Sequence, residues 1–251
     1  MIFVLAVKLL SVYAHVAVKC RVLLLALDTC DSRGSLALVE DTHVLAETSH
    51  PENADFSSWL IPAVDELLSS NRLSHADLAG YAVASGPGSF TGVRVGLTTA
   101  KAWSEIYGKP IYPISRLAVL AESASAEYAA AFINAQRSQI FAALYRRSAQ
   151  GWQTIIQESV IRPLDFFASS MESARKSSLT WVSLDPEILS STPFWQSHLQ
   201  EAPVVTVRPP LAAALGMLAL RNPAAVDALT LDANYVRRTD AEIFGKKAAT
   251  P

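Results

Sequence analysis

The sequence is poor in cysteine and in charge. Its 251 residues include two cysteines, Cys20 and Cys30, with no C-x-x-C pair and no cysteine–histidine set at zinc-binding spacing. A disulfide framework is therefore not expected, and a reducing cytoplasm is the predicted compartment. The 21 basic and 23 acidic residues give a net charge of −2, which lacks the basic excess typical of a chain that binds nucleic acid by itself.

Histidine is also scarce, and its placement argues against a metal site. His15, His43, His50, His75 and His198 never stand four residues apart, so no helix face can carry a histidine pair. We therefore expect no bound metal and no cofactor, and we expect the histidines at surface or loop positions. What the chain does contain in quantity is hydrophobic residues, at 51%. This content predicts a well-buried globular protein of one large domain or two small lobes.

Residues 1–21 form a mostly apolar leader that is interrupted by Lys8, Ser11, His15 and Lys19. These polar positions recur every three or four residues, so they would share one stripe of a helix. A membrane span needs about 20 uninterrupted apolar residues, which this segment lacks. We interpret the leader as an over-long translation start or a docking helix, and we expect no membrane association.

The remaining chain alternates apolar strands with amphipathic helices. The continuous apolar run at 23–28 predicts a strand buried on both faces. A helix is expected to begin at a cap formed by Ser57 or Ser58, with Pro62 in its first turn. The other segments predicted up to residue 128 are strands at 35–39, 44–48, 80–84 and 111–114 and helices at 57–71, 93–107 and 117–128. Weaker signals predict strands at 131–134, 140–145, 152–158 and 179–184, helices at 163–171 and 211–220, and a polar tail at 237–251.

A glycine-rich turn, Gly-Pro-Gly-Ser-Phe-Thr-Gly at 86–92, joins the strand at 80–84 to the helix at 93–107. Its spacing fits neither a Walker loop nor a dinucleotide-binding loop. A turn of this kind can present free N–H groups to an anion, or it can serve backbone geometry alone. Together with the carboxylate that ends the first strand, the candidates for a nucleotide or phosphate site are Asp28, Gly86, Gly88, Ser89, Thr91, Gly92 and Arg94.

Four segments occur in one order along the chain: Asp28-Thr29, the loop 86–92 with the Val-Arg-Val-Gly that follows it, Asn134-Ala135-Gln136-Arg137, and Asn234-Tyr235-Val236-Arg237. In this combination the chain resembles the TsaB (YeaZ) family over about residues 22–243. The resemblance implies a two-lobe actin-like (ribonuclease H-like, ASKHA) α/β fold. The lobes are expected at 22–125 and 126–251, the second being the smaller.

The chain departs from the pattern of the TsaB family at two places. It has Phe56-Ser57 where His-Ser is common at the start of the first helix. It has Asn134-Ala135-Gln136 where Asp-Ala-Arg is usual in the hairpin of the second lobe. The second departure removes a carboxylate, which argues against a ligand role for that hairpin but not against the fold.

The resemblance also bears on catalysis. TsaD, the catalytic relative, holds a metal through a His-x-x-x-His pair on the helix after the last strand of the first lobe. Here Arg116 and Leu120 fall in that region, and neither can replace an imidazole. No Ser/His/Asp or Cys/His set stands out elsewhere. We therefore expect no catalytic residues in this chain.

By resemblance, the chain is a non-catalytic subunit of the tRNA N6-threonylcarbamoyladenosine transferase complex. Its implied partners are TsaD and the ATPase TsaE, with a homodimer as an alternative assembly, and tRNA is reached only through the complex. The partner surface is expected on the helices at 57–71 and 93–107. Its candidate residues are Trp59, Leu60, Val64, Gly92, Gly96, Leu97, Ala100 and Trp103. Packing of these residues inside their own lobe is the alternative.

Two other functions remain open at this point. An actin-like ATPase or small-molecule kinase is motivated by Asp28 and the loop 86–92. A metallopeptidase is a label carried by relatives of this fold, and the missing histidine pair argues against it.

Overall fold

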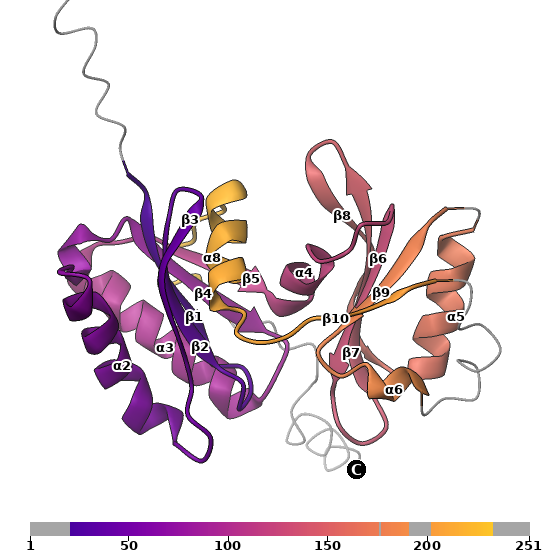
Figure 1. The fold of residues 1–251 in the computed structure, drawn as a ribbon, viewed down its shortest axis with the longest axis horizontal. Helices are drawn as coiled ribbons and strands as arrows, with labels where there is room; N and C mark the ends of the chain where they lie inside the picture. The colour runs from indigo at the N-terminus through magenta and orange to yellow at the C-terminus, as the bar shows by residue number, and fades with distance from the viewer. Residues whose placement is uncertain (1–20, 176, 191–201, 233–251) are drawn as a thin grey trace, which may run out of the picture.

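The structure, a computed structural model, describes residues 21–175, 177–190 and 202–232, which form two lobes side by side (Figure 1). Each lobe is built on one five-stranded sheet. The leader before Arg21, the predicted Asn234–Arg237 segment and the polar tail lie outside the described residues.

The first sheet has the strand order β3-β2-β1-β4-β5. Its strands are β1 (Leu23–Asp28), β2 (Ser35–Glu40), β3 (His43–Ser49), β4 (Gly80–Gly86) and β5 (Ile111–Ser115). The helices of this part of the chain are α2 (Phe56–Ser70), the short 3-10 helix η1 (His75–Asp77), α3 (Phe90–Tyr107) and α4 (Arg116–Ala121).

The second sheet has the strand order β10-β9-β6-β7-β8. Its strands are β6 (Tyr128–Asn134), β7 (Ile140–Ser148), β8 (Gly151–Ile161), β9 (Leu179–Ser183) and β10 (Val204–Thr206). The helices that follow are α5 (Pro163–Ser173), α6 (Glu187–Ser190) and α8 (Ala212–Arg221).

The two sheets repeat one connectivity. In the first sheet β1 pairs antiparallel with β2 and parallel with β4, and β4 pairs parallel with β5. In the second sheet β6 pairs antiparallel with β7 and parallel with β9, and β9 pairs parallel with β10. The predicted two-lobe α/β architecture is therefore confirmed.

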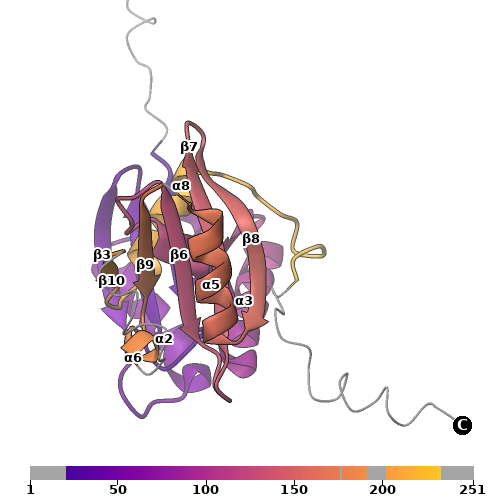
Figure 2. The same ribbon diagram turned by 90° about the vertical axis from the view of Figure 1, so that its right-hand side faces the viewer.

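Strand β1 is the centre of the first lobe. All six of its residues are buried, as the continuous apolar run predicted. Helices α2 and α3 cover the outer face of the sheet, and α8 covers the face toward the second lobe (Figure 1). In the second lobe, α5 lies across the outer face of the sheet (Figure 2). Because β1, β4 and β5 are parallel, their carboxyl ends lie at one edge of the first sheet.

Two helices cross between the lobes. Helix α4, which follows β5, buries Leu117 and Leu120 against the second sheet. Helix α8, which follows β10, packs on the first sheet, where Gly216 leaves room for Val39 and Ala26. Helix α4 thus follows the first sheet in the chain and packs on the second, whereas α8 follows the second sheet and packs on the first. The lobe boundary at 125/126 stays a prediction.

Two predicted helices differ from the observed ones. Helix α2 begins at Phe56 after Asp55, which makes no side-chain cap, and Pro62 lies in its interior and not in the first turn. Helix α4 ends at Ala121, whereas the alanine-rich sequence predicted a helix to residue 128. The chain has to leave the helix there because Tyr128 begins β6, whose pairing with β7 and β9 outweighs local helix propensity. Among the described helices, none combines the length and hydropathy that a bilayer span requires.

Candidate functional site

The site predicted from the sequence lies where the parallel strands of the first sheet end. Asp28 is the last residue of β1, Gly86 ends β4, and Arg116 directly follows β5. Ligands of open α/β sheets bind outside this edge because the loops that leave the strands converge there. The loops from Thr29 to Gly34 and from Pro87 to Ser89 meet at this edge.

A buried ion pair occupies the centre of this edge. The Nε atom of Arg116 lies 3.1 Å from Oδ2 of Asp28, and the two side chains are 1% and 0% exposed. The other oxygen of Asp28 accepts a hydrogen bond from the backbone N–H of Cys30, at 3.0 Å. The guanidinium also donates to the carbonyl oxygen of Pro87, at 3.5 Å. The Asp28 carboxylate is thus already neutralised and hydrogen-bonded by its own chain.

Asp31 extends this ion pair into a network. Its Oδ2 atom accepts hydrogen bonds from the guanidinium groups of Arg116, at 2.9 Å, and Arg33, at 2.7 Å. Burial alone would raise the pKa of Asp31, but the two guanidinium groups outweigh it and hold this pKa at about 2. Burial lowers and the flanking carboxylates raise the pKa of Arg116, and the net effect is an increase. Asp31 and Arg116 are therefore both charged at neutral pH.

The network continues into the second lobe. Arg33 donates to Oδ1 of Asp185, at 2.8 Å, and to the carbonyl oxygen of Leu184, at 3.4 Å. Asp185 follows strand β9, so this contact joins the loop after β1 to the second sheet.

Cys30 sits beside the ion pair but is not a nucleophile. Its side chain is fully buried, and its Sγ atom points to the carbonyl oxygen of Ala84, at 3.7 Å. Burial and the negative charge of Asp28 raise the pKa of this thiol well above its ordinary value. A thiol in such surroundings stays protonated and inert.

The glycines of the loop 86–92 serve close packing. A Cβ atom on Gly88 would lie 2.5 Å from the carbonyl oxygen of Cys30, and one on Gly92 would lie 2.1 Å from that of Thr29. The hydroxyl of Thr29 donates to the carbonyl oxygen of Gly92, at 2.7 Å. Gly86 has a φ of 115°, a conformation that favours glycine. These contacts explain why glycine occupies these positions, through close packing and backbone conformation alone. The alternative, binding of an anion, is not needed to explain them.

The predicted phosphate-site residues differ in exposure. The buried carboxylate of Asp28 forms an ion pair with Arg116, and Gly86 and Gly92 are buried. Ser89, Thr91 and Arg94 are exposed around the start of α3. There the hydroxyl of Ser89 accepts from the N–H of Gly92, and the guanidinium of Arg94 lies 3.7 Å from the centre of the Phe90 ring. A contact between the loop 86–92 and a nucleotide stays a prediction.

Most of the predicted partner-contact residues lie inside the first lobe. Leu60, Val64, Gly92, Gly96, Leu97, Ala100 and Trp103 are all buried, and Trp59 is half-buried. Gly96 in particular faces the side chain of Thr29, because a Cβ atom there would lie 2.5 Å from its hydroxyl oxygen. These seven residues form the core of the lobe, so a partner surface on α2 and α3 has to consist of the exposed residues beside them.

Sequence reasoning missed the roles of Arg116, Arg33 and Asp185. In the sequence, Arg116 stands out only as a residue that cannot replace a histidine. One signal was available, since an arginine that opens the apolar run Leu-Ala-Val-Leu needs a buried acidic partner. Which carboxylate it meets follows from the strand order and not from the sequence. Among the described residues, no group of three or more histidine, cysteine, aspartate or glutamate side chains is arranged to hold a metal ion.

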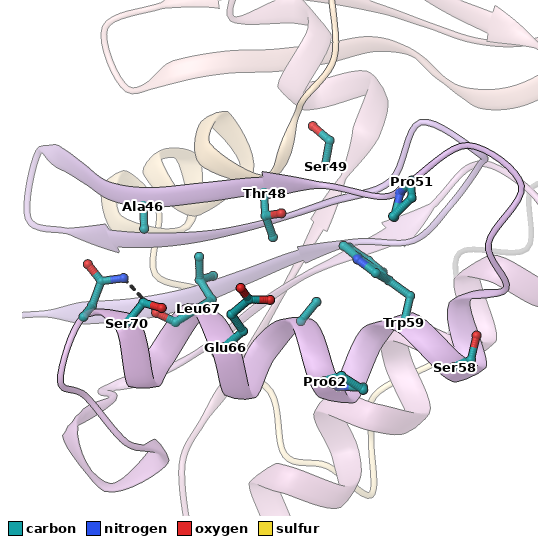
Figure 3. Close-up of a pocket in the computed structure, with 12 residues that line it drawn as sticks. Ala46, Thr48, Ser49, Pro51, Ser58, Trp59, Pro62, Glu66, Leu67 and Ser70 are labelled. Atoms are coloured by element: carbon teal, nitrogen blue, oxygen red, sulfur yellow. Dashed lines mark hydrogen bonds between the residues drawn. The ribbon is translucent and has the colours of Figure 1, made fainter.

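A separate groove lies between β3 and α2 (Figure 3). Its volume is about 580 Å³, and among the residues that the structure describes Glu66 is the only charged one in its lining. Trp59, Ala63 and Leu67 provide apolar lining, and Thr48 and Ser58 are among its hydroxyl-bearing residues. The groove offers no acid–base pair for catalysis and shares no residue with the Asp28–Arg116 network.

We expect removal of the Arg116 charge to destabilise the fold strongly. In Arg116→Met the buried carboxylate of Asp28 loses its counter-charge, which costs about 3–5 kcal/mol of unfolding free energy. The double variant Asp28→Asn/Arg116→Met should lose less than Arg116→Met alone, because no uncompensated charge is then buried. Urea unfolding measures both values. Arg162→Met, which breaks an exposed ion pair with Asp165, is the control and should change stability little. A larger loss in the double variant than in Arg116→Met would contradict this account.

We also expect a specific pH dependence of stability. The pKa of Asp31 is about 2 in the folded chain and 3.8 ordinarily, so its stabilisation is complete above pH 4 and is lost as the pH falls toward 2. The difference between the two pKa values corresponds to about 2 kcal/mol. Urea unfolding is measured between about pH 2.5 and about pH 5. As the pH falls, the free energy of unfolding should decrease more steeply for the wild type than for Asp31→Asn. Equal slopes would show that Asp31 is not held by the two guanidinium groups.

Comparison with known proteins places this geometry in a family. A family model described as TsaD, tRNA N6-adenosine threonylcarbamoyltransferase, matches residues 43–193. Two solved structures from Pseudomonas aeruginosa share the fold. One is YeaZ, with a TM-score of 0.63 and 21% identity over 83% of this chain and 97% of that chain. The other is an uncharacterized protein with similarity to peptidase YEAZ, with a TM-score of 0.64 and 22% identity over 86% and 100%. They confirm the actin-like fold.

Relatives of known sequence carry the name tRNA threonylcarbamoyladenosine biosynthesis protein TsaB. That of Haemophilus influenzae is 34% identical over 56% of this chain and 64% of its own length. Those of Bacillus subtilis and Escherichia coli are 34% and 30% identical, over 49% and 56% of this chain and 55% and 62% of their own lengths. Each match thus spans less than two thirds of the relative. Taken with the family model, which covers more than half of the chain, they show that this protein belongs to the TsaD family as a TsaB (YeaZ) member.

Proposed function

We propose that this chain is a non-catalytic subunit of the tRNA N6-threonylcarbamoyladenosine transferase complex, where it binds and supports TsaD. The observation that carries the proposal is the ion pair between Asp28 and Arg116. An actin-like kinase or ATPase needs the carboxylate at this position for its metal and phosphate groups. Here the carboxylate is committed to a guanidinium group of the same chain.

The other functions fit these residues less well. An ATPase or small-molecule kinase would have to displace Arg116 from two carboxylates before a metal could approach Asp28. A metallopeptidase would need metal ligands where α4 carries Arg116 and Leu120, and both side chains are buried in other contacts. Support of a partner requires neither a metal nor a nucleotide in this chain.

The outer face of α2 and α3 is the surface we assign to TsaD. Its exposed apolar residues are Ile61 on α2 and Phe90, Ile106 and Tyr107 on α3. Ile106 is the most exposed of the four, at 70%. Together the four residues offer apolar area that a partner could cover. We place TsaE as a further partner of the same complex, tRNA in contact through the complex, and the chain in the cytoplasm.

An activity measurement tests the proposal. The purified chain alone should transfer no threonylcarbamoyl group from its adenylate to tRNA, because the described residues include no group of side chains that could hold a metal ion and the carboxylate of Asp28 is paired with Arg116. Addition of the chain to the TsaD of the same organism, with TsaE and ATP, should raise the transfer activity of TsaD. Transfer by the chain alone, or no effect on TsaD, would refute the proposal.

A surface variant tests the assigned face. Ile106→Glu places a carboxylate in the proposed apolar contact and should weaken binding to TsaD about tenfold or more, or ~1.4 kcal/mol. Ile155→Glu on β8 is the matched control, since Ile155 is also an exposed isoleucine but lies in the second lobe. Calorimetric titration with TsaD measures both affinities. Equal weakening by the two variants would show that the contact lies elsewhere.

A further inference from the structure

We propose that Arg33 is a latch that sets the angle between the two lobes. Its side chain reaches from the loop after β1 to Asp185, directly after β9. The inference concerns the free chain and does not depend on the proposed role with TsaD.

The first-lobe end of the latch is held by Asp31. The Nε and Nη2 atoms of Arg33 donate to Oδ2 of Asp31, at 3.2 and 2.7 Å, and the backbone N–H of Arg33 donates to Oδ1, at 2.9 Å. The Nη1 atom is therefore available to donate to the second lobe. Because the guanidinium is planar and its other side is already bound, Nη1 is pre-oriented toward Asp185.

The second-lobe end is equally well anchored. While Oδ1 of Asp185 accepts from Arg33, Oδ2 accepts from the backbone N–H of Asn134, at 2.9 Å. The N–H of Asp185 donates to the hydroxyl of Ser183, at 2.9 Å, and that hydroxyl donates to the carbonyl oxygen of Phe132, at 2.7 Å. These hydrogen bonds fix Asp185 to strands β6 and β9, so its contact with Arg33 restrains the second sheet relative to the first lobe.

The latch is the outer part of a chain of alternating charges. It runs from Asp28 through Arg116, Asp31 and Arg33 to Asp185. The inner pair is almost fully buried, whereas Arg33 is 33% exposed. The inner part therefore provides a rigid base, and the Arg33–Asp185 contact is the link that can open at the lowest cost.

The position of the latch gives it leverage. Helices α4 and α8 cross and touch between the lobes, which makes them the natural hinge. The latch lies at the end of the molecule where β1 stops and where the chain leads into α6 (Figure 1). A contact away from a hinge limits its rotation, so loss of the Arg33–Asp185 contact should let the lobes sample a wider range of angles.

The test measures the distance between the lobes in the full-length chain. Spin labels are attached at Ser70→Cys on α2 and Ala168→Cys on α5, both exposed, in a Cys20→Ser background that keeps the buried Cys30. Distances are measured by double electron–electron resonance. We expect one narrow distribution for the labelled parent, and a wider, shifted one for Arg33→Gln and for Asp185→Asn.

Further variants separate the latch from a local role. The double variant Arg33→Gln/Asp185→Asn should match either single variant, because both act through one contact. Arg162→Gln, whose ion pair with Asp165 lies within the second lobe, should leave the distribution unchanged. Should Arg33→Gln fail to fold, Asp185→Asn decides, since an amide oxygen still accepts from Asn134. An unchanged distance distribution in Asp185→Asn overturns the proposal. The proposal also fails if Arg162→Gln widens the distribution as much as Asp185→Asn does.

Discussion

The ion pair between Asp28 and Arg116 governs what the edge of the first sheet can do. Removing both charges from water is costly, and the attraction between them offsets this only when the remaining hydrogen-bonding groups are satisfied. Here Asp31, the N–H of Cys30 and the carbonyl of Pro87 satisfy them. Asp28 stands where an α/β sheet can offer a carboxylate to a ligand, but here it stabilises the fold through its ion pair with Arg116.

The glycine-rich turn directly stabilises this ion pair. It carries the carbonyl of Pro87 to Arg116, and its glycines let α3 approach the backbone of Thr29 and Cys30 more closely than any side chain would permit. The feature that looks most like a ligand-binding loop in the sequence therefore shapes the surroundings of Asp28. Because the Asp28 carboxylate is paired with Arg116 in this way, it is not free for a ligand, and the face of α2 and α3 remains the surface we propose for a partner.

Helices α4 and α8 connect the two lobes, because each packs on the sheet of the other lobe. Each helix is continuous in sequence with one lobe and buries much of its apolar face on the other. The loop after β1 adds a charged contact to the segment after β9. The same topology in both lobes brings these two segments together, which is why residues 152 positions apart can form an ion pair.

The sequence by itself determined most of the strands and helices and the family, because apolar periodicity, glycine turns and short motifs are local properties. It also placed Asp28 at the end of a buried strand. It did not reveal the short edge strand β10 (Val204–Thr206). Only the tertiary structure decided that Arg116 closes on Asp28, that α8 returns to the first sheet, and that Val64, Leu97 and Trp103 face inward. These outcomes depend on strand order and on which faces meet, and an amphipathic pattern gives a helix an apolar side without naming what covers it.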